Sequence, residues 1–559
     1  MTTRTRSLHT ALAGAGAIAT AVALTAASPG SLTPEANAAT AANTAPACSS
    51  ATLVHTNKGS VCGVTANGVT TYEGIPYAAS PVGKLRWKSP VPATRWATTL
   101  HATTPVKECP SPGFPPGSPP TKNTTEDCLN VKVQIPAGAR PGERLPVMYE
   151  VHGGGFLGEA RTDDGSNLVR TGKVVYVFVN YRLGILGFLA NKALGAHSGD
   201  YGIQDQQAGL RWVKQNINRF GGNPNNVTVF GESAGGASTC DQIASPTAKG
   251  LFQRAISISG FYNYQNNIVW SKGDCKSTYF TEAQAQKVGD KYATKVGCGN
   301  VKDVAKCLRN VPVKKLLAAG GQFTLPTAGG TIGPIVNGTT LTMSPAKAFA
   351  TGHVNKVNLI TDVGRDEFNG GVYNNTPGLH AVVAETPAQY RQLVREQFGR
   401  LAGTVERLYP LNRYTSPFVA YRTIMADSAS VCPMLRADDQ LSRYMPVYAD
   451  IDTDADNPAG EGLTQVLGAQ HSETNGLVHF PTSKLDPNQK ALQTQLLLEW
   501  TNFARTGNPM APQTPAWPLY KTYMKPVMLL RPAGSSSVAP TEFITSQHQC
   551  AFWNKTTRY

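Results

Sequence analysis

The sequence predicts an α/β fold in which helices cover both faces of a mostly parallel sheet and helical insertions roof one end of it. Three observations indicate this fold. Short runs rich in β-branched and aromatic residues recur along the chain, several of them are apolar almost throughout, and an amphipathic segment separates two of them. Alternating strands and helices are typical of parallel sheets, and strands covered on both faces are continuously apolar.

Six runs are expected as strands because of their length and their content of β-branched and aromatic residues. Between the second and the third of them, residues 203–220 bring Ile203, Leu210, Val213, Ile217 and Phe220 close to one face of a helix. In such folds, functional groups collect at the carboxyl ends of the strands. The expected strands are residues 145–151, 173–181, 226–230, 254–260, 356–363 and 445–451.

Two long segments, residues 264–350 and 372–440, show helical patterns without a regular succession of strands. We expect them to be the insertions that roof the sheet and select the substrate, because loops on a rigid scaffold often carry specificity. The proline-rich residues 111–127 are expected to form a surface loop between Cys109 and Cys128 rather than a linker between domains.

The N-terminus has the pattern of a secretory signal peptide. Two arginines precede the apolar residues 11–27, and Ala36-Asn37-Ala38 provides a small-x-small cleavage pattern. The apolar run is shorter than the roughly 20 residues that span a bilayer. We therefore expect residues 1–38 to be removed, residues 39–47 to be a short linker, residues 48–559 to form a single domain, and the protein to be secreted without a membrane span.

Charge and cysteine content narrow the class of protein further. The formal net charge is +15, but the lysines and arginines are scattered, without a basic run or zinc-finger spacing, so we expect no nucleic-acid partner. All ten cysteines follow the expected cleavage site, and none forms a CxxC pair. In an exported protein this pattern favours five disulfides, whose connectivity the spacing leaves open.

A candidate nucleophile follows the third expected strand. Gly231-Glu232-Ser233-Ala234-Gly235 matches G-x-S-x-G, and further small residues follow it. Small residues permit a sharp strand-to-helix bend that exposes the serine hydroxyl, whereas the alternative is a plain turn. A helix that begins at this bend favours negative charge beside Ser233.

Three consecutive glycines follow the first expected strand, in His152-Gly153-Gly154-Gly155-Phe156. Backbone N–H groups without neighbouring Cβ atoms can approach the oxyanion of a tetrahedral intermediate, and this placement is typical of an oxyanion loop. The alternative is a flexible turn.

Seven stretches together resemble the type-B carboxylesterase/lipase family, the α/β-hydrolases that include cholinesterases and fungal lipases. The resemblance covers nearly the whole chain after the expected signal peptide. It implies an α/β-hydrolase catalytic domain and a serine esterase that cleaves carboxylic esters of small molecules or lipids through an acyl-enzyme, with no metal or cofactor. The stretches are EDCLNV (126–131), HGGGF (152–156), NYRLGILGFL (180–189), DYGIQDQQAGLRWVKQNINRFGGNP (200–224), VTVFGESAGG (227–236), NFARTGNP (502–509) and CAFWN (550–554).

The acid of the expected triad lies near the fifth expected strand, since the α/β-hydrolase order is serine, acid, histidine. The family's acid sits in a D-E-G run, which GRDEF matches at Glu367. Phe368 replaces the glycine of that run, and Asp366 is the alternative acid.

The base is expected at His471, on the loop after the last expected strand, where the resemblance places it. The other eligible histidines are less suited to the role. His479 lies in LVHF, which is typical of a packed side chain, and His548 lies two residues from Cys550. The triad implied by the resemblance is Ser233, Glu367 and His471.

The resemblance also assigns supporting roles. Gly154, Gly155 and Ala234 would supply the oxyanion-hole N–H groups, and Glu232 would support the electrostatics of His471, unless it is only a buried acid in a local hydrogen-bond network. The implied disulfides are Cys109–Cys128, Cys298–Cys307 and Cys432–Cys550, which leaves Cys48 with Cys62 and Cys240 with Cys275.

Two other functions remain open at this point. The same triad could hydrolyse amides or peptides, because the chemistry is shared. A non-catalytic, cholinesterase-like binding domain is the second alternative, although such relatives typically lose the serine or its partners. The loop between Cys109 and Cys128 contains no tryptophan, whereas cholinesterases place a choline-binding indole there, so choline esters are not expected.

Overall fold

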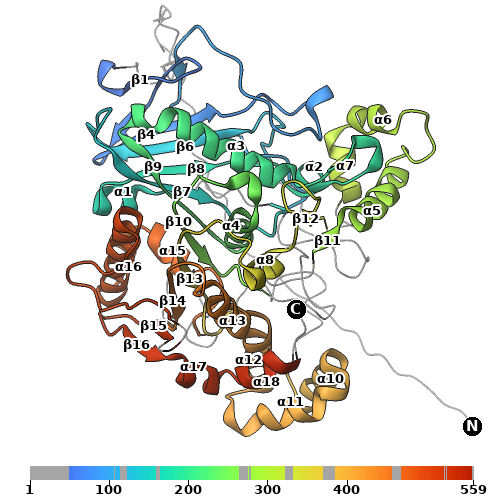
Figure 1. The fold of residues 1–559 in the computed structure, drawn as a ribbon, viewed down its shortest axis with the longest axis vertical. Helices are drawn as coiled ribbons and strands as arrows, with labels where there is room; N and C mark the ends of the chain where they lie inside the picture. The colour runs from blue at the N-terminus through green and yellow to red at the C-terminus, as the bar shows by residue number, and fades with distance from the viewer. Residues whose placement is uncertain are drawn as a thin grey trace, which may run out of the picture. The chain divides into compact units, whose positions relative to one another are not determined.

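An eleven-stranded mixed sheet runs through the protein, in the order β16-β15-β14-β13-β10-β9-β7-β8-β6-β4-β3 (Figure 1). Neighbours from β8 to β15 are parallel, and the strands at both ends pair antiparallel. The strands are β3 (Val64–Ala66), β4 (Val69–Pro76), β6 (Asn130–Pro136), β7 (Leu145–Val151), β8 (Val175–Val179), β9 (Gly222–Glu232), β10 (Arg254–Ile258), β13 (Asn358–Asp362), β14 (Val447–Asp452), β15 (Pro526–Leu530) and β16 (Ser537–Pro540).

The coordinates come from a computed structural model. The expected signal peptide and linker lie outside the described residues. No helix in the described part of the chain is long and apolar enough to cross a membrane. The described residues are 49–105, 107–113, 122–158, 164–262, 275, 279–320, 332–368, 384–455, 468–521, 523 and 525–556.

Each of the six expected strands overlaps a strand of the sheet, namely β7, β8, β9, β10, β13 and β14. The prediction of a mostly parallel α/β sheet is therefore confirmed. The strands that the sequence analysis did not include lie mainly at the two ends of the sheet, where pairing is antiparallel. Two small sheets accompany the main one, formed by β1 (Leu53–His55), β2 (Ser60–Cys62) and β5 (Leu100–His101), and by β11 (Phe280–Thr281) and β12 (Ile335–Val336).

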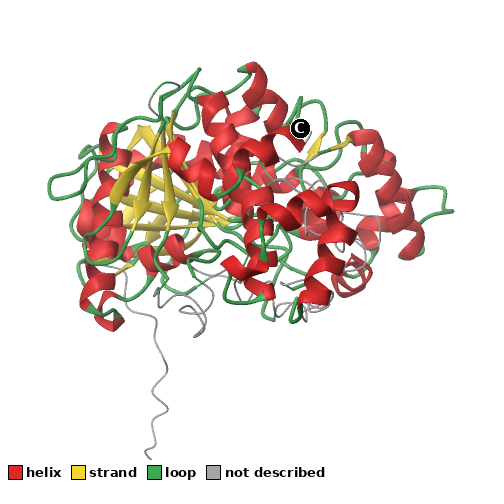
Figure 2. Cartoon of the chain, turned by 90° about the horizontal axis from the view of Figure 1, so that it is seen from below, coloured by secondary structure: helices red, strands yellow, loops and turns green. Residues whose placement is uncertain are grey.

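Helices cover both faces of the sheet (Figure 2). One face packs against α1 (Ser166–Gly172), α15 (Glu473–His479) and α16 (Pro487–Thr506). The opposite face packs against α3 (Tyr201–Asn216), α4 (Ala234–Ala244), α8 (Pro345–Thr351) and α13 (Cys432–Leu441). Val229 belongs to one core and its neighbour Phe230 to the other, which is why these strands are apolar at successive positions.

The two expected insertions are mainly helical where the structure describes them. The expected helix at 203–220 is α3 followed by a 3₁₀ turn, Ile217–Phe220. The remaining helices are α2 (Gly184–Phe188), α5 (Glu282–Lys295), α6 (Val304–Asn310), α7 (Val313–Gly320), α10 (Pro387–Phe398), α11 (Ala402–Leu408), α12 (Pro417–Ala426), α17 (Thr541–Gln547) and α18 (Cys550–Thr556).

Disulfides tie several of these segments together. Cys62 is disulfide-bonded, and Cys48, its expected partner, lies outside the described residues. The other pairs in the structure coincide with those given by the sequence analysis, and they are Cys109–Cys128, Cys240–Cys275, Cys298–Cys307 and Cys432–Cys550.

A buried acid in α16 makes the stability of the fold sensitive to pH. Glu499 is fully buried, and its Oε1 accepts a hydrogen bond of 3.1 Å from Nε2 of Gln495. Burial raises the pKa of Glu499 to about 8, although the bond from Gln495 acts in the opposite direction. The folded state therefore binds the carboxyl proton of Glu499 more tightly than the unfolded state does. The contribution of this proton to the stability of the fold is fully present below the ordinary carboxyl pKa and is lost as the pH rises to about 8.

Substitution Glu499→Gln should therefore flatten the pH dependence of stability. The amide keeps the shape of the protonated acid and has no proton to lose, so the variant should exceed the wild type at pH 9 by on the order of a few kcal/mol. Urea unfolding at several pH values measures this difference. Glu542→Gln, at an exposed position in α17, is the control, and equal pH profiles for wild type and Glu499→Gln would contradict the prediction.

Candidate active site

Ser233 occupies the bend between β9 and α4. Its backbone has φ 57° and ψ −120°, a left-handed conformation that is strained for a residue with a Cβ atom. Ser233 N donates to Ile258 O at 2.9 Å, and Ala237 N donates to Ser233 O at 2.8 Å, so both sides of the bend are held. The strand-to-helix bend favoured by the sequence is therefore present, with the N-terminus of α4 at the serine.

The glycines on either side of Ser233 are required by close packing against β7. A Cβ atom on Gly235 would lie 1.9 Å from Val151 O, and one on Gly231 would lie 2.3 Å from the same oxygen. Because the obstacle is backbone rather than a flexible side chain, it cannot move aside cheaply. The small residues of G-x-S-x-G thus let the bend press onto the neighbouring strand.

The glycine loop after β7 lies directly against Ser233. A Cβ atom on Gly153 would be 3.2 Å from Ser233 Cβ. Gly154 and Gly155 have φ of 87° and 61°, in the region that favours glycine. Within the described part of the chain, the structure shows no acceptor for the backbone N–H groups of Gly154, Gly155 and Ala234. Three amides near the serine are thus available to a developing oxyanion.

His152 anchors this loop and is not a candidate base. Its ring stacks on Tyr181 with centroids 4.4 Å apart, and the Tyr181 hydroxyl donates to His152 O at 2.9 Å. Burial lowers the pKa of His152 to about 4, against smaller opposing effects of the Gly153 carbonyl and Glu150. The ring is therefore neutral and structural at ordinary pH.

His471 lies between two carboxylates. Its Nδ1 bonds to Glu367 Oε1, and its Nε2 lies 2.9 Å from Glu232 Oε1. The contact of Nε2 is thus with the residue that precedes Ser233 in the chain. Ser472 Oγ also donates to Glu232 Oε1, which fixes this carboxylate beside the end of β9.

The electrostatic balance at His471 favours the charged ring. Burial lowers the pKa of His471, but Glu232 and Glu367 outweigh it and raise this pKa to about 10. Both carboxylates act through charge and through hydrogen bonds to the ring. In this arrangement His471 is an imidazolium ion below that pH.

Glu367 is fully buried and surrounded by hydrogen-bond donors. Its Oε2 accepts from Gly364 N at 2.9 Å and from Ser259 Oγ at 3.1 Å, and its Oε1 accepts from the Tyr262 hydroxyl. These donors hold the carboxylate in a fixed position beside His471. Ser259 and Tyr262 were not identified from the sequence. Ser259 lies near the end of the predicted strand 254–260 and Tyr262 lies two residues beyond it, which was the available signal.

The alternative residues lie elsewhere. Asp366 Oδ2 accepts from Ala469 N at 3.1 Å and so braces the loop that carries His471, rather than contacting the ring. His479 packs beside Glu150, with Nε2 at 3.3 Å from Oε1. His548 pairs with the buried Asp427 at 2.5 Å. Each of these two histidines is therefore paired with a carboxylate other than Glu232 and Glu367.

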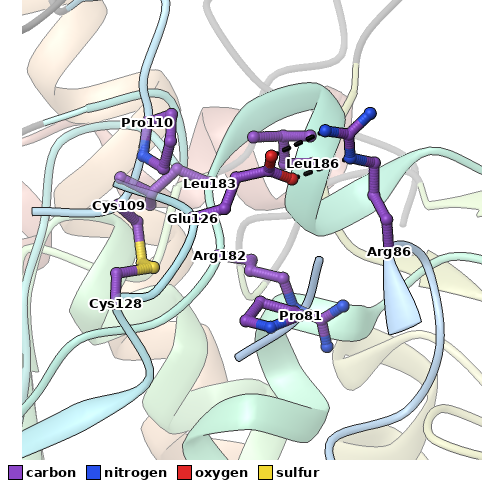
Figure 3. Close-up of a pocket in the computed structure, with 9 residues that line it drawn as sticks. All are labelled: Pro81, Arg86, Cys109, Pro110, Glu126, Cys128, Arg182, Leu183 and Leu186. Carbon is purple, nitrogen blue, oxygen red and sulfur yellow. Dashed lines mark hydrogen bonds and ion pairs between the residues drawn. A yellow bond between two sulfur atoms is a disulfide. The ribbon is translucent and has the colours of Figure 1, made fainter. Parts of the chain in front are cut away.

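A small pocket lies beside the Cys109–Cys128 disulfide (Figure 3). Arg86 and Glu126 form an ion pair of 2.6 Å at its rim. Its volume of about 10 Å³ is room for about one water molecule. An ester substrate does not fit there, and neither Ser233 nor His471 is among the residues that line this pocket. The structure shows no group of three or more His, Cys, Asp or Glu residues within its described part that could hold a metal ion.

Comparison with known proteins shows the family of the chain. The model of the carboxylesterase family matches residues 50–553. The chain belongs to the carboxylesterase family. It is an α/β-hydrolase and a carboxylic ester hydrolase, as its fold and its esterase relatives together show.

The relatives extend over most of the chain. It is 33% identical to the Para-nitrobenzyl esterase of Bacillus subtilis (strain 168), covering 86% of this chain and 94% of the relative. It is 30% identical to the Cocaine esterase of Homo sapiens, covering 87% of each. A solved structure of PNB esterase superposes with a TM-score of 0.72 at 30% identity, covering 89% of this carboxylesterase and all of the other chain.

The close approach at Gly235 gives a direct test of the site's packing. Gly235→Ala should destabilise the esterase by roughly 1–3 kcal/mol and reduce its turnover, because the new methyl group meets the Val151 carbonyl. Thermal unfolding and ester hydrolysis measure the two effects. Gly403→Ala in α11 is the control, since its nearest neighbour is Arg407 Nη1 at 3.8 Å, and an equally mild effect at both positions would contradict the packing argument.

Proposed function

We propose that this carboxylesterase is a secreted serine esterase that cleaves its substrate through an acyl-enzyme on Ser233, with His471 as base and Glu367 as the acid that orients it. One observation carries the proposal. The bond from His471 Nδ1 to Glu367 places Nε2 at the carboxyl end of β9, where Glu232 and Ser233 are consecutive residues. A single ring thus bonds to Glu367 on one side and contacts Glu232, the residue before Ser233, on the other, which supports the proposal.

The ring must become neutral before it can accept the serine proton. When Nδ1 keeps its proton and donates it in a hydrogen bond to Glu367, the neutral ring carries its lone pair on Nε2. A lone pair on Nε2 does not bind the Glu232 carboxylate. The contact between Nε2 and Glu232 therefore ends when Nε2 loses its proton. In the proposed cycle Nε2 then accepts the hydroxyl proton of the neighbouring Ser233 as the oxygen attacks the ester carbonyl.

The remaining steps use groups around the serine. The amides of Gly154, Gly155 and Ala234 would stabilise the oxyanion, together with the N-terminus of α4. The alcohol leaves with the proton from His471, and water then cleaves the acyl-enzyme by the same route. Glu232 would stabilise the imidazolium that forms in each half of the cycle.

Secretion is the second part of the proposal. The disulfides of the structure form and persist in an oxidising compartment, and the first 38 residues have the composition of a signal peptide. Mass spectrometry of the protein recovered from culture medium would identify the new N-terminus, which we expect near Ala39. Retention of residues 1–38 in the folded product would contradict secretion by this route.

Ser233→Ala should abolish hydrolysis while leaving the fold intact, because the hydroxyl is the attacking group. We expect wild type to hydrolyse p-nitrophenyl acyl esters and p-nitrobenzyl esters, and the variant to lose on the order of 10⁴-fold or more in kcat. Matching anilides test the alternative amide hydrolase. Equal ester turnover in wild type and variant would refute the nucleophile, and anilide turnover without ester turnover would favour the alternative.

Glu232→Gln should move the pH profile of the esterase. In the wild type, kcat/KM should rise as His471 loses its proton, in the alkaline range. Removing one of the two carboxylate charges destabilises the imidazolium and lowers its pKa, so the rising limb should shift to lower pH by roughly 1–3 units. Glu232→Asp, which keeps the charge, is the control, and an unchanged limb in Glu232→Gln would argue against this role.

A further inference from the structure

Tyr262 follows β10 and reaches both the proposed base, His471, and the acid paired with it, Glu367. Its side chain is buried, and its ring lies 5.9 Å from the imidazole of His471 and 5.7 Å from the ring of Phe368, measured between centroids. Its hydroxyl lies 2.7 Å from His471 Nδ1 and also bonds to Glu367 Oε1. The phenol oxygen of Tyr262 therefore contacts both His471 and Glu367.

The protons in this cluster can be assigned from its chemistry. A carboxylate only accepts hydrogen bonds, so the Tyr262 hydroxyl donates to Glu367. His471 Nδ1 is within hydrogen-bonding distance of the same Oε1 atom of Glu367. An unprotonated Nδ1 and a carboxylate oxygen would repel each other so close together, so Nδ1 carries a proton. The phenol oxygen, with its own proton directed to Glu367, then presents a lone pair to the Nδ1–H group.

We propose that Tyr262 is a positioning residue of this esterase that holds His471 in the tautomer with the proton on Nδ1 and stabilises its imidazolium form directly. The proposal rests on the function proposed for Ser233, His471 and Glu367. With Nδ1 protonated and held by two oxygens, the basic nitrogen of the neutral ring is Nε2, the one on the side of Ser233. A rotated or tautomerised ring would turn its bare nitrogen away from the nucleophile.

Ser259 provides a matched comparison. Its hydroxyl donates to Oε2 of Glu367 at 3.1 Å, so Ser259→Ala removes one donor from the same carboxylate. Tyr262→Phe also removes one donor from Glu367, but it additionally removes the oxygen next to Nδ1. The difference between the two variants isolates the contact between Tyr262 and the imidazole.

The test compares both variants with wild type on a p-nitrophenyl ester, normalised to active sites titrated with a phosphonate that labels Ser233. For Tyr262→Phe we expect kcat to fall by about 5- to 50-fold with KM changed by less than about twofold. The rising limb of its pH profile should lie at lower pH than that of Ser259→Ala by about half a unit or more, because the imidazolium has lost an acceptor. Coincident limbs, or a kcat within twofold of wild type, would overturn the proposal.

A second measurement, made on the wild type, does not depend on whether Tyr262→Phe folds. ¹⁵N NMR of ring-labelled histidine, with His471→Gln to assign the signal, reports which nitrogen carries the proton in the neutral ring. We expect Nδ1, and a proton on Nε2 would overturn the proposal. Because these spectra require no substrate, they remain informative if wild type fails to hydrolyse esters, an outcome that would count against the proposed function instead.

Discussion

The contact of one buried imidazole with two buried carboxylates is the interaction on which the site depends. A histidine ring in an apolar interior would lose its charge, whereas Glu232 and Glu367 raise the pKa of His471 to about 10. Each carboxylate has its own donors, Ser472 on one side and Gly364 and Ser259 on the other. Charge is therefore kept inside the protein by a closed set of hydrogen bonds.

The parallel sheet brings this set together. Glu232 ends β9, Ser259 follows β10, and Glu367 follows β13, and these three strands are adjacent. Residues at the carboxyl ends of adjacent parallel strands meet at one end of the sheet even when more than a hundred positions separate them in the chain. The insertions between these strands are longer than the strands themselves, but the strands still pair side by side with their carboxyl ends together.

The glycines around the serine connect packing with chemistry. The bend at Ser233 approaches β7 closely, and the 1.9 Å that would separate a Gly235 Cβ atom from Val151 O makes any larger residue destabilising at this position. The same closeness brings Gly153 against the serine. A requirement of backbone packing thus places Ser233, the proposed nucleophile, beside the amides proposed to receive the oxyanion.

Local patterns in the sequence determined the strands at the centre of the sheet, the bend at Ser233 and the glycine loop after β7, because each depends on residues close together in the chain. Only the tertiary structure decided which acid meets His471, since Asp366 and Glu367 are neighbours and differ in the direction of their side chains. It also decided that Tyr262 joins the pair and that Nε2 contacts Glu232, since hydrogen bonds between distant strands depend on register and burial, which no local pattern records.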